Sequence, residues 1–596
     1  MSPADRLKPA TGRSFMVAAA NPLAAKAGCA VLKRGGTAID AAIAVQAVLA
    51  VVEPQASGLV GGTLITYWDN DKKRVRYFEG LSRAPKASGK GLRTPVGDDA
   101  QRCGAKPDRL MPTTVNFTAR AVGVPGTLRV LELAHKSLGK ERWNTLFDDG
   151  IRLARSGFPL PKYLHTLLGE EAKPGGVGKG LKRCRYPNLM ARFCIDRDTP
   201  KAIGAPVRNP ELAAVLELVR DGGAAALYDA KGKIVQGILA RLAETSCKLS
   251  IKDGAPAVMA GLVTGEDFER YEARERKPVC RVAFNHVVCS ASPPSFGGGA
   301  VLSILKLADV AGIAKHTPDS LAHAHIMIES SRLTQADRRQ YVGDPDHKQP
   351  PMDGLLASAY LAERARLIKL DRAVPTIQPG ALPTRGLRPV EMNDPTAATL
   401  QDQTSHVTIV DRYGNALAMT TTNNSSFGAQ MEALGMVLNN VLVNFTRAGS
   451  ISLGYDVNAM RPFGRPRTAM APTIVFDRNM KLRLVVGAAG GGAIPDYVAN
   501  TILRVLVFGM DPQTAINQPH VSGQNVISKC DGKPGYVSEV EQGTPLAAYV
   551  AQLKAMGHPC ARAVRLRSGL TAIAISPDGR LHGAADPRRD GVAVGE

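Results

Sequence analysis

Residues 403–411, Gln-Thr-Ser-His-Val-Thr-Ile-Val-Asp, decide how this chain folds and what chemistry it can carry. β-Branched and apolar residues between Val407 and Val410 predict a β-strand, and Thr404 stands at its head. A second group of hydroxyl and amide side chains, Thr-Thr-Thr-Asn-Asn, follows at 420–424. Taken alone, this stretch is typical of an ordinary strand start, so its meaning depends on the rest of the chain.

A threonine becomes far more reactive when it is the first residue of a chain. A neutral alcohol is a poor nucleophile and needs an adjacent base. A free α-amino group has a pKa of roughly 7.7–8.0 and can accept a proton near neutral pH, whereas an amide nitrogen cannot. Cleavage between Gln403 and Thr404 would therefore place nucleophile and base on one residue.

Motifs rich in glycine, proline and polar residues recur along the whole chain. They are MVAAANPLA at 16–24, GGTAIDAA at 35–42, VEP at 52–54, GLVGG at 58–62, VGVPGT at 122–127, PPSFGGG at 293–299, HIMIE at 325–329, GDP at 343–345, LNN at 438–440, MAPTI at 470–474, GG at 490–491 and AADPRR at 584–589. In order and spread these motifs resemble the γ-glutamyltranspeptidase family from about residue 16 to the C-terminus. The resemblance is specific to the family and leaves the substrate open.

The resemblance implies an α+β fold, the four-layer αββα sandwich of N-terminal-nucleophile hydrolases. It also implies that the chain cuts itself into a large fragment, 1–403, and a small catalytic fragment, 404–596, which stay associated. Thr404 matches the nucleophile and Thr422 matches the hydroxyl that hydrogen-bonds to it. Gly490 and Gly491 match the pair whose backbone N–H groups form the oxyanion hole, a use that a glycine turn suits.

The substrate-binding positions depart from the family's pattern. Asn424 matches a polar residue near the substrate, but the carboxylate-binding arginine falls at Leu81. Arg83 lies two residues further on, which on a strand moves the charge by roughly 6–7 Å. A paired-serine motif reads Thr468-Ala469 here, so one hydroxyl is lost.

The acidic residue that binds the substrate's α-ammonium group in the family falls at Asn444. Loss of a charge-paired contact in a closed site typically costs about 2–5 kcal/mol. Arg83, Arg465 and Arg467 are the candidates to replace the missing arginine.

The expected activity is cleavage of γ-glutamyl amides such as glutathione. The alternatives are an acylase for a related amide without the α-amino group, of glutaryl type, and a non-catalytic basic paralogue.

Composition limits the possible partners of this chain. Of its 596 residues 44% are apolar and 21% charged, as in soluble globular proteins. The net charge is +22, but it is spread along the chain without long runs of one sign, which favours a solvated surface over nucleic-acid binding. We find no apolar run of about 18 residues and expect no membrane span. We expect no cofactor.

Two motifs contain residue types that bind phosphate or metal ions in other proteins. The glycine runs 297–299 and 490–492 lack the spacing and the following lysine of phosphate-binding loops. His323 and His325, with Glu329 one turn on, have metal-binding residue types. On a helix, however, two residues two apart point in different directions, so packed or surface histidines are favoured.

Cysteine spacing bears on the compartment. Cys280 and Cys289 bracket a predicted hairpin, Cys184 and Cys194 lie in a basic segment, and Cys530 and Cys560 lie in the last quarter. Such pairs indicate disulfides and a periplasmic or secreted protein. The first 30 residues lack a clear signal peptide, which leaves reduced thiols in a cytoplasmic protein as the alternative.

Periodicity predicts the main elements. Helices are expected at 23–32, 38–52, 128–137, 143–156 and 300–311. Strand pairs are expected at 64–67 and 75–78, 407–410 and 416–421, 474–476 and 482–486, and 571–575 and 581–583. Segments 170–205 and 372–402 are expected to be loops. The second is rich in proline and precedes Thr404, which suits either a cleavable segment or a plain linker.

Overall fold

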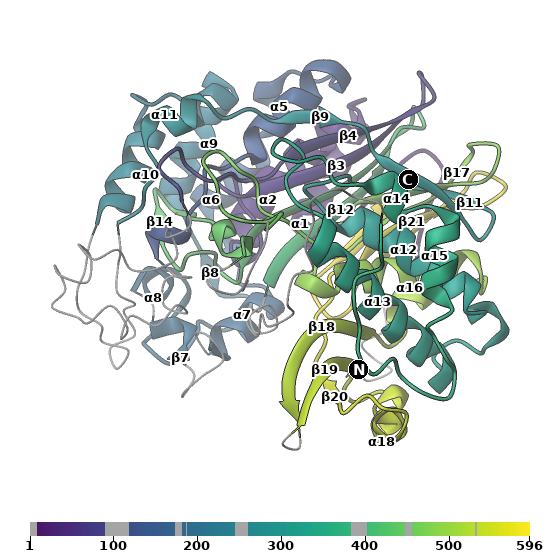
Figure 1. Cartoon of the computed structure of the whole chain (residues 1–596). Coiled ribbons are helices and arrows are strands. Elements are labelled where there is room, and N and C mark those ends of the chain that lie inside the picture. The colour runs from purple at the N-terminus through teal and green to yellow at the C-terminus, as the bar shows by residue number, and fades with distance from the viewer. Residues whose placement is uncertain are drawn as a thin grey trace, which may run out of the picture.

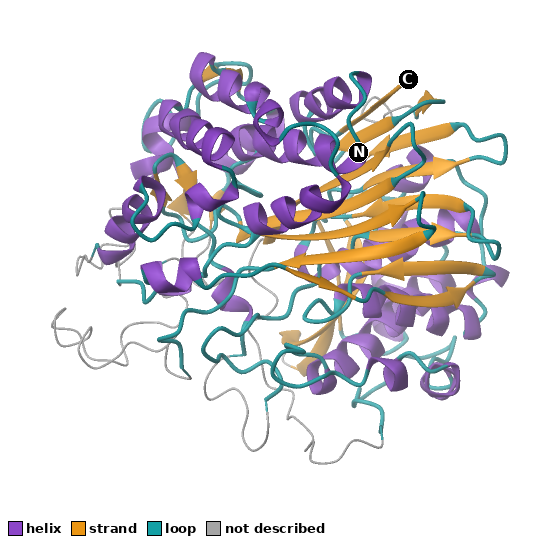
Figure 2. Cartoon of the chain, turned by 90° about the horizontal axis from the view of Figure 1, so that it is seen from above, coloured by secondary structure: helices purple, strands orange, loops and turns teal. Residues whose placement is uncertain are grey.

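Two stacked antiparallel sheets form the centre of the molecule. The computed structural model describes residues 9–89, 118–172, 181–185, 187–244, 260–382, 402–446, 456–530 and 533–596. Figure 2 shows the long strands running together, with helices above and below them. Each sheet has seven strands. Sheet I carries Thr404, and sheet II packs against it.

In spatial order, sheet I consists of β23 (Val592–Gly595), β2 (Met16–Ala19), β12 (Asp402–Val410), β13 (Ala416–Ser425), β3 (Gly62–Asp69), β4 (Arg74–Gly80) and β9 (Arg274–Arg276). Sheet II consists of β1 (Ala10–Gly12), β22 (Leu581–Ala585), β21 (Thr571–Ile575), β17 (Leu482–Gly487), β16 (Thr473–Phe476), β11 (His286–Ser290) and β10 (Val279–Ala283). The four predicted strand pairs are all present as antiparallel neighbours. Strand β12, which carries Thr404, lies near the middle of sheet I.

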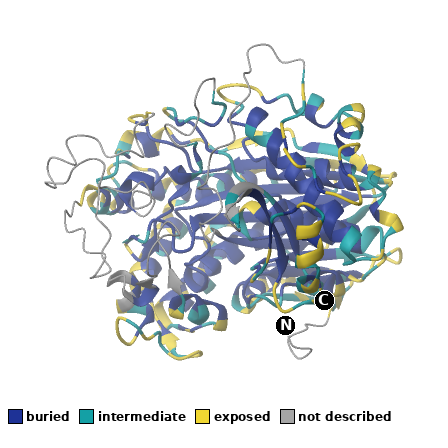
Figure 3. Ribbon diagram, turned by 60° about the horizontal axis from the view of Figure 1, so that its bottom comes forward, coloured by how far each residue is buried: buried dark blue, intermediate teal, exposed yellow. Residues whose placement is uncertain are grey.

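Three apolar cores separate four layers. One core joins sheet I to α1 (Pro22–Lys33), α2 (Ala38–Val52), α5 (Thr127–Leu138) and α6 (Asp148–Ser156). A second joins sheet II to α12 (Gly297–Val310), α13 (Leu321–Tyr341) and α16 (Ile494–Leu506). The third lies between the sheets, where the rings of Trp68 and Phe476 are 4.7 Å apart. The predicted αββα sandwich is therefore confirmed, and Figure 3 shows its buried strands and its exposed outer turns and helix faces.

Helix α2 forms where the sequence predicts it. Its N-terminus carries a capping box, in which the Thr37 N–H and hydroxyl both donate to Asp40 at 2.8 and 2.9 Å. Every residue from Ala38 to Val52 is buried, because the helix lies between sheet I and other helices. The helix ends at Glu53, a buried carboxyl at the end of an apolar run.

Smaller elements surround the sandwich (Figure 1). Beside sheet I lies a helical lobe, which consists of α7 (Lys162–Gly169), α8 (Pro187–Phe193), α9 (Pro210–Gly222), α10 (Lys233–Ala243) and α11 (Gly265–Glu269). The lobe also contains three short strand pairs: β5 (Phe158–Pro159) with β8 (Pro206–Val207), β6 (Glu171–Ala172) with β7 (Leu181–Lys182), and β14 (Glu432–Ala433) with β15 (Met436–Val437). Near α13 lie a three-stranded sheet of β18 (Val521–Cys530), β19 (Lys533–Glu541) and β20 (Cys560–Val564), and the helices α14 (Met352–Leu355), α15 (Ser358–Ala365), α17 (Pro512–Asn517) and α18 (Val550–Ala555).

Three predicted segments differ from the structure. Segment 143–156 is a 3-10 turn, η4 (Trp143–Leu146), followed by α6, because Phe147 ends one helix and Asp148 begins the next. Segment 170–205 is predicted to be loop, yet α8 forms within it. Helix α12 begins at Gly297, inside the glycine run. Of the predicted loop 372–402, residues 383–401 lie outside the described residues.

The cysteine pairs predicted from spacing are disulfides. Cys184 bonds to Cys194, Cys280 to Cys289 and Cys530 to Cys560. The second bond joins directly opposite residues of β10 and β11. Within the described ranges, none of the helices combines the length and the hydrophobicity needed to cross a bilayer.

Truncation of Phe476 should strongly destabilise the sandwich. Its ring is fully buried between the sheets against Trp68, so Phe476→Ala removes apolar contacts and leaves a cavity. We expect the free energy of unfolding to fall by about 3–5 kcal/mol, measured by urea titration. Val282→Ala on β10, where the side chain is 46% exposed, is the matched control and should cost far less. Equal losses in the two variants would contradict this description of the core.

Candidate active site around Thr404

An irregular pairing of β12 with β13 creates the site. Gln403 pairs with Asn424 and Ser405 pairs with Thr421, so two residues of β13 lie opposite the single residue Thr404. Bulges of this kind redirect side chains at functional positions. Here the irregularity brings the hydroxyl oxygens of Thr404 and Thr422 to 3.1 Å.

The Thr422 hydroxyl connects three groups. It accepts hydrogen bonds from the Thr404 hydroxyl and, at 2.8 Å, from the Asn424 N–H. It donates to the carbonyl oxygen of Gln403 at 2.7 Å. These hydrogen bonds are those of a chain in which Gln403 and Thr404 remain joined by a peptide bond. In it the hydroxyl of Thr404 and the carbonyl that precedes Thr404 share one hydrogen-bonding partner.

The backbone around Thr422 leaves no room for a side chain on the neighbouring strand. A Cβ atom at Gly61 would lie 2.3 Å from the Thr422 carbonyl oxygen. Asn424 has a φ of +78°, a left-handed conformation that asparagine tolerates better than most residues. The motif at 58–62 and the asparagine pair at 423–424 therefore both allow the backbone conformation that β13 adopts around Thr422.

Neutral amides line the site next to Asn424. Its Oδ1 accepts from Asn444 Nδ2 at 2.8 Å, and its Nδ2 donates to Asn440 Oδ1 at 3.1 Å. Asn444, at the end of η10 (Val441–Asn444), accepts at its carbonyl from Asn458 Nδ2 at 2.8 Å. The structure thus brings Thr404, Thr422, Asn424 and Asn444 into one hydrogen-bonded chain made of uncharged groups.

The glycine pair lies beside β12. Gly490 and Gly491 form the turn between β17 and α16, with φ angles of +124° and +60°. The 3-10 turn η11 (Gly491–Ala493) contacts β12. A Cβ atom at Gly490 would lie 2.5 Å from the Tyr497 ring, so close packing and positive φ both require glycine there.

Two charged residues for which the sequence predicts no role contact Thr404 and Ser405. Glu53 Oε2 accepts from the Ser405 hydroxyl at 2.7 Å, and the Ser57 hydroxyl donates to Ser405 at 3.1 Å. Arg589 donates to the Thr404 carbonyl at 2.8 Å and to the Ser568 carbonyl at 2.9 Å. Glu53 lies in the motif at 52–54 and Arg589 in the motif at 584–589. The sequence signal that could have identified them is a charged residue next to a buried apolar segment.

Burial changes the acidity of Glu53. The loss of water around its carboxyl raises the pKa to about 7, although Arg589 and the Ser405 hydroxyl act in the opposite direction. The group can therefore change its charge near neutral pH while it contacts the residue that follows Thr404.

On the other side of the predicted cleavage point, Tyr163 contacts Gln403. The Tyr163 hydroxyl donates to Gln403 Oε1 at 3.0 Å, and both side chains are buried. Helix α7, far upstream in the chain, therefore fixes the last residue of the predicted large fragment.

The three arginines considered as replacements have other contacts. Arg83 donates to the carbonyl of Arg270 at 2.5 Å, and its guanidinium lies over the ring of Phe463. Arg465 forms ion pairs with Glu79 and Asp346 at 3.1 and 3.0 Å. Arg467 donates to backbone carbonyls at the end of α13, among them that of Arg338 at 3.2 Å.

The remaining predicted site residues, Thr468 and Ala469, pack against the start of α12. Thr468 accepts at its carbonyl from the Phe296 N–H at 3.0 Å, and Gly297 lies against the Ala469 carbonyl. This contact places the segment between sheet II and α12.

The histidines of α13 point in different directions, as predicted. His323 contacts Asn500 at 3.1 Å, and His325 contacts His558 at 2.9 Å. Among the residues that the structure describes, no three His, Cys, Asp or Glu side chains gather as metal ligands.

The four layers of helices and stacked sheets are the fold of the N-terminal-nucleophile hydrolases. A family model, Gamma-glutamyltranspeptidase, matches residues 24–596, and the chain belongs to this family. It is accordingly an enzyme of the hydrolase and transferase kind.

Similar proteins include both glutathione hydrolases and acylases. The glutathione hydrolase proenzyme of Bacillus subtilis (strain 168) is 30% identical over 98% of this chain and 92% of its own length. The acylase ACY 1 proenzyme of Pseudomonas sp. (strain V22) is 29% identical over 98% and 94%. The crystal structure of cephalosporin acylase from Bacillus halodurans covers 99% of this chain and 97% of its own, with a TM-score of 0.76 and 21% identity, which shows a shared fold.

The raised pKa of Glu53 predicts a loss of stability as pH rises. Between the ordinary value of 4.5 and about 7 the unfolded carboxyl ionises while the folded one keeps its proton. The folded state then binds more protons, so the free energy of unfolding falls with pH by at most about 3 kcal/mol. Glu53→Gln should lack this contribution.

The comparison uses Thr404→Ala as background, so that the protein stays one chain during urea titration at pH 5 and pH 8. Glu272→Gln, at a side chain that is 73% exposed, is the matched control. If Glu53→Gln leaves the pH dependence of stability unchanged, Glu53 does not titrate as described.

Proposed function

We propose that this chain cleaves itself between Gln403 and Thr404 and then hydrolyses or transfers the acyl group of a small amide through an acyl-Thr404 intermediate. The observation that carries the proposal is the Thr422 hydroxyl, which bonds both to the Thr404 hydroxyl and to the Gln403 carbonyl. The two fragments, 1–403 and 404–596, would remain together because β12 is paired with β2 and β13 is paired with β3, and both partners belong to the large fragment.

Self-cleavage would begin at the hydroxyl of Thr404. Its oxygen attacks the Gln403 carbonyl carbon, the C–N bond breaks, and the hydroxyl proton passes to the departing nitrogen. The product is an ester of Gln403 on Thr404 with a free α-amine. Water then hydrolyses the ester and leaves a carboxylate at Gln403 and a free hydroxyl on Thr404.

Turnover would repeat this chemistry on the substrate. The Thr404 oxygen attacks the acyl carbonyl carbon while the α-amine of Thr404 takes the proton and passes it to the leaving amine. The backbone N–H groups of Gly490 and Gly491 would stabilise the oxyanion. Water or a second amine then attacks the acyl-threonine ester and regenerates the hydroxyl.

The acyl group is proposed to be γ-glutamyl, as in glutathione, or its glutaryl analogue without the α-amino group. Asn444 favours the second, because the side chains that hydrogen-bond to the Asn424 amide in the structure, Asn440 and Asn444, are neutral and give an ammonium group no ionic partner. Similar proteins include a glutathione hydrolase and an acylase, which supports keeping both acyl groups in the proposal. The three disulfides support a periplasmic or secreted location.

Replacement of the nucleophile should abolish self-cleavage. Wild-type protein should give two fragments whose masses match residues 1–403 and 404–596, whereas Thr404→Ala should stay one chain. Thr404→Ser is the matched variant and should still cut, because it keeps a hydroxyl. Denaturing gels with intact mass spectrometry provide the measurement. Wild-type protein that remains folded and uncut after long incubation would contradict the proposed self-cleavage.

Exchange of one neutral amide for an acid should change the preferred acyl group. We expect the wild type to prefer glutaryl over γ-glutamyl anilides, and Asn444→Asp to shift the ratio of kcat/KM toward γ-glutamyl by about tenfold, or about 1.4 kcal/mol. The reason is the new carboxylate available to the ammonium group. Asn479→Asp, in the exposed turn after β16, is the control and should leave the ratio unchanged. A tenfold wild-type preference for the γ-glutamyl anilide would contradict the predicted glutaryl preference and indicate an ordinary glutathione hydrolase.

A further inference from the structure

A cavity of about 690 Å³ lies at the end of the sandwich where hairpin turns of both sheets meet. Sheet I contributes the turns after β3 and β12, and sheet II contributes the turns after β16 and β21. Strand β12 runs from Thr404 toward this end and contributes Val410 to the cavity wall. Six residues of extended chain span about 20 Å, so the cavity is separate from the site around Thr404.

The inner wall of the cavity is apolar. Trp68, Val410 and Leu581 line it and are buried, and Leu482 and Ile575 line it and are half-buried. All five belong to or pack against the apolar core between the two sheets, so the cavity opens directly onto that core. An apolar group in the cavity would therefore take hydrophobic surface out of water.

The outer part of the cavity is positively charged. Arg13, Lys73, Arg412 and Lys481 line it, and all four are exposed. Among the residues that the structure describes, none of the four forms an ion pair with a carboxylate.

The hydrogen bonds of these cations go to neutral oxygens. Lys73 Nζ donates to Asn70 Oδ1 at 2.9 Å, and Arg412 donates to the carbonyl of Leu32 at 3.1 Å. Lys481 Nζ donates to the Pro577 carbonyl at 3.4 Å. Each cation therefore keeps its full charge available to a ligand that carries an acid group.

The acidic residues of these turns do not neutralise the cavity. Asp411, the one carboxylate among the described lining residues, is buried and accepts from the N–H groups of Ala38 and Asn415 at 2.9 and 3.0 Å. The other turns also have an aspartate that accepts from backbone N–H groups of its own turn: Asp69 from Lys72, Asp477 from Asn479 and Lys481, and Asp578 from Arg580. The aspartates thus shape the turns, and the cations are left to face the cavity.

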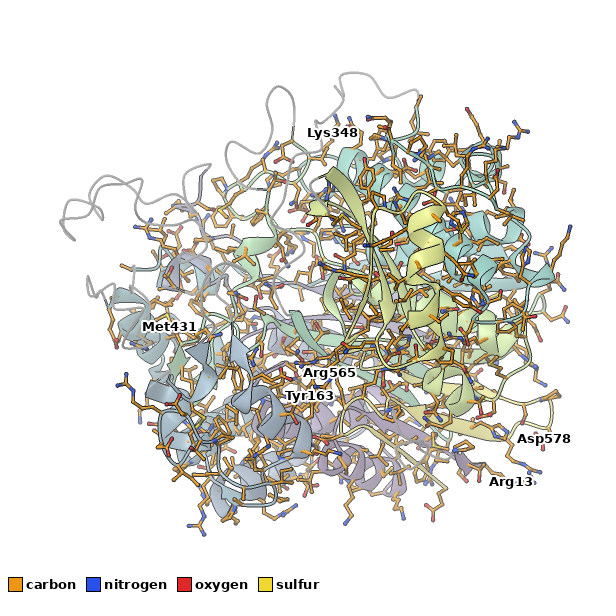
Figure 4. All side chains as sticks on the ribbon, turned by 90° about the horizontal axis from the view of Figure 1, so that it is seen from below. Arg13, Tyr163, Lys348, Met431, Arg565 and Asp578 are labelled. Atoms are coloured by element: carbon orange, nitrogen blue, oxygen red, sulfur yellow. A yellow bond between two sulfur atoms is a disulfide. The ribbon has the colours of Figure 1, made fainter. Side chains whose placement is uncertain are left out.

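The cavity lies away from the residues that contact the predicted cleavage point. Figure 4 places Arg13 and Asp578 together at one edge of the molecule, and Tyr163, which contacts Gln403, nearer its middle. Asp578 already pairs with Arg580 at 3.2 Å, so it leaves the Arg13 guanidinium without a carboxylate of its own.

We infer that this cavity is a second ligand site, which binds a small organic carboxylate with an aromatic ring or a short apolar chain. The apolar part would lie against Trp68, Leu482 and Ile575, and the carboxylate would lie among the cations, near Arg13 and Lys481. The volume suits a small molecule. Neither half alone would use the cavity fully, because a neutral ring gains nothing from the cations and a bare inorganic anion gains nothing from the apolar wall. The site goes beyond the proposed reaction and does not depend on it.

Tryptophan fluorescence gives a local readout, because the chain has two tryptophans and one of them, Trp68, lines the cavity. In a Trp143→Phe background, Trp68 is the sole tryptophan. The probes are 4-nitrobenzoate, whose nitroaromatic ring quenches tryptophan on contact, and 4-nitrobenzamide, its neutral counterpart. We expect saturable quenching with a Kd at least about tenfold lower for the benzoate, and an advantage that shrinks in high salt because the attraction is screened.

Arg13→Gln combined with Lys481→Gln should reduce the advantage of the benzoate to less than about threefold. Lys231→Gln combined with Arg366→Gln is the matched control, since both residues are exposed and neither lines the cavity. The control pair removes the same charge and should keep the advantage.

Calorimetry with 4-nitrobenzoate repeats the comparison on proteins that keep both tryptophans. Binding that is weaker by about tenfold in the Arg13→Gln, Lys481→Gln protein, and unchanged in the control pair, supports the inference. Quenching without saturation, equal Kd values for the benzoate and the benzamide, or equal binding to the two double variants overturns it. Neither readout involves self-cleavage or hydrolysis, so these outcomes leave the proposed function standing.

Discussion

The hydroxyl of Thr422 is the contact on which the rest of the site depends. It receives the Thr404 hydroxyl at 3.1 Å and holds the Gln403 carbonyl at 2.7 Å. Regular cross-strand neighbours lie directly opposite one another, as Thr63 and Thr421 do, whereas Thr404 and Thr422 are not opposite partners in the register and meet only where it is irregular. The irregular pairing opposite Thr404, the absence of a side chain at Gly61 and the left-handed backbone at Asn424 together allow it.

The sandwich supports this contact from both sides. Sheet I is buried between helices and sheet II, so β12 cannot move far without opening a core. Glu53 and Arg589, one from each predicted fragment, fix the Ser405 side chain and the Thr404 carbonyl. A cut at Gln403 would therefore free one chain end while the new first residue stays in place, which is the preorganisation that efficient catalysis requires.

Much of the fold could be predicted from local patterns and ordered motifs. The alternation at 407–410, the Thr37 cap of α2 and the paired cysteines at 280 and 289 depend on neighbours in sequence. The contacts that refine the site do not. Glu53 and Ser405 are separated by 352 residues, and Tyr163 and Gln403 by 240, so no periodicity reveals them. The ion pairs of Arg465 depend on Glu79 and on Asp346, which lies 119 residues earlier in the chain, so the sequence alone does not show that this arginine already has partners.

The central claim is that Thr404 acts as a nucleophile that is also a chain terminus. The most direct measurement is mass spectrometry of the smaller fragment, quenched in acid during turnover of a slow acyl donor and then mapped by proteolysis. We predict a fragment of residues 404–596 that carries one acyl group on the peptide beginning at Thr404. An acyl group on any other residue, or a fragment that begins elsewhere, would contradict the claim.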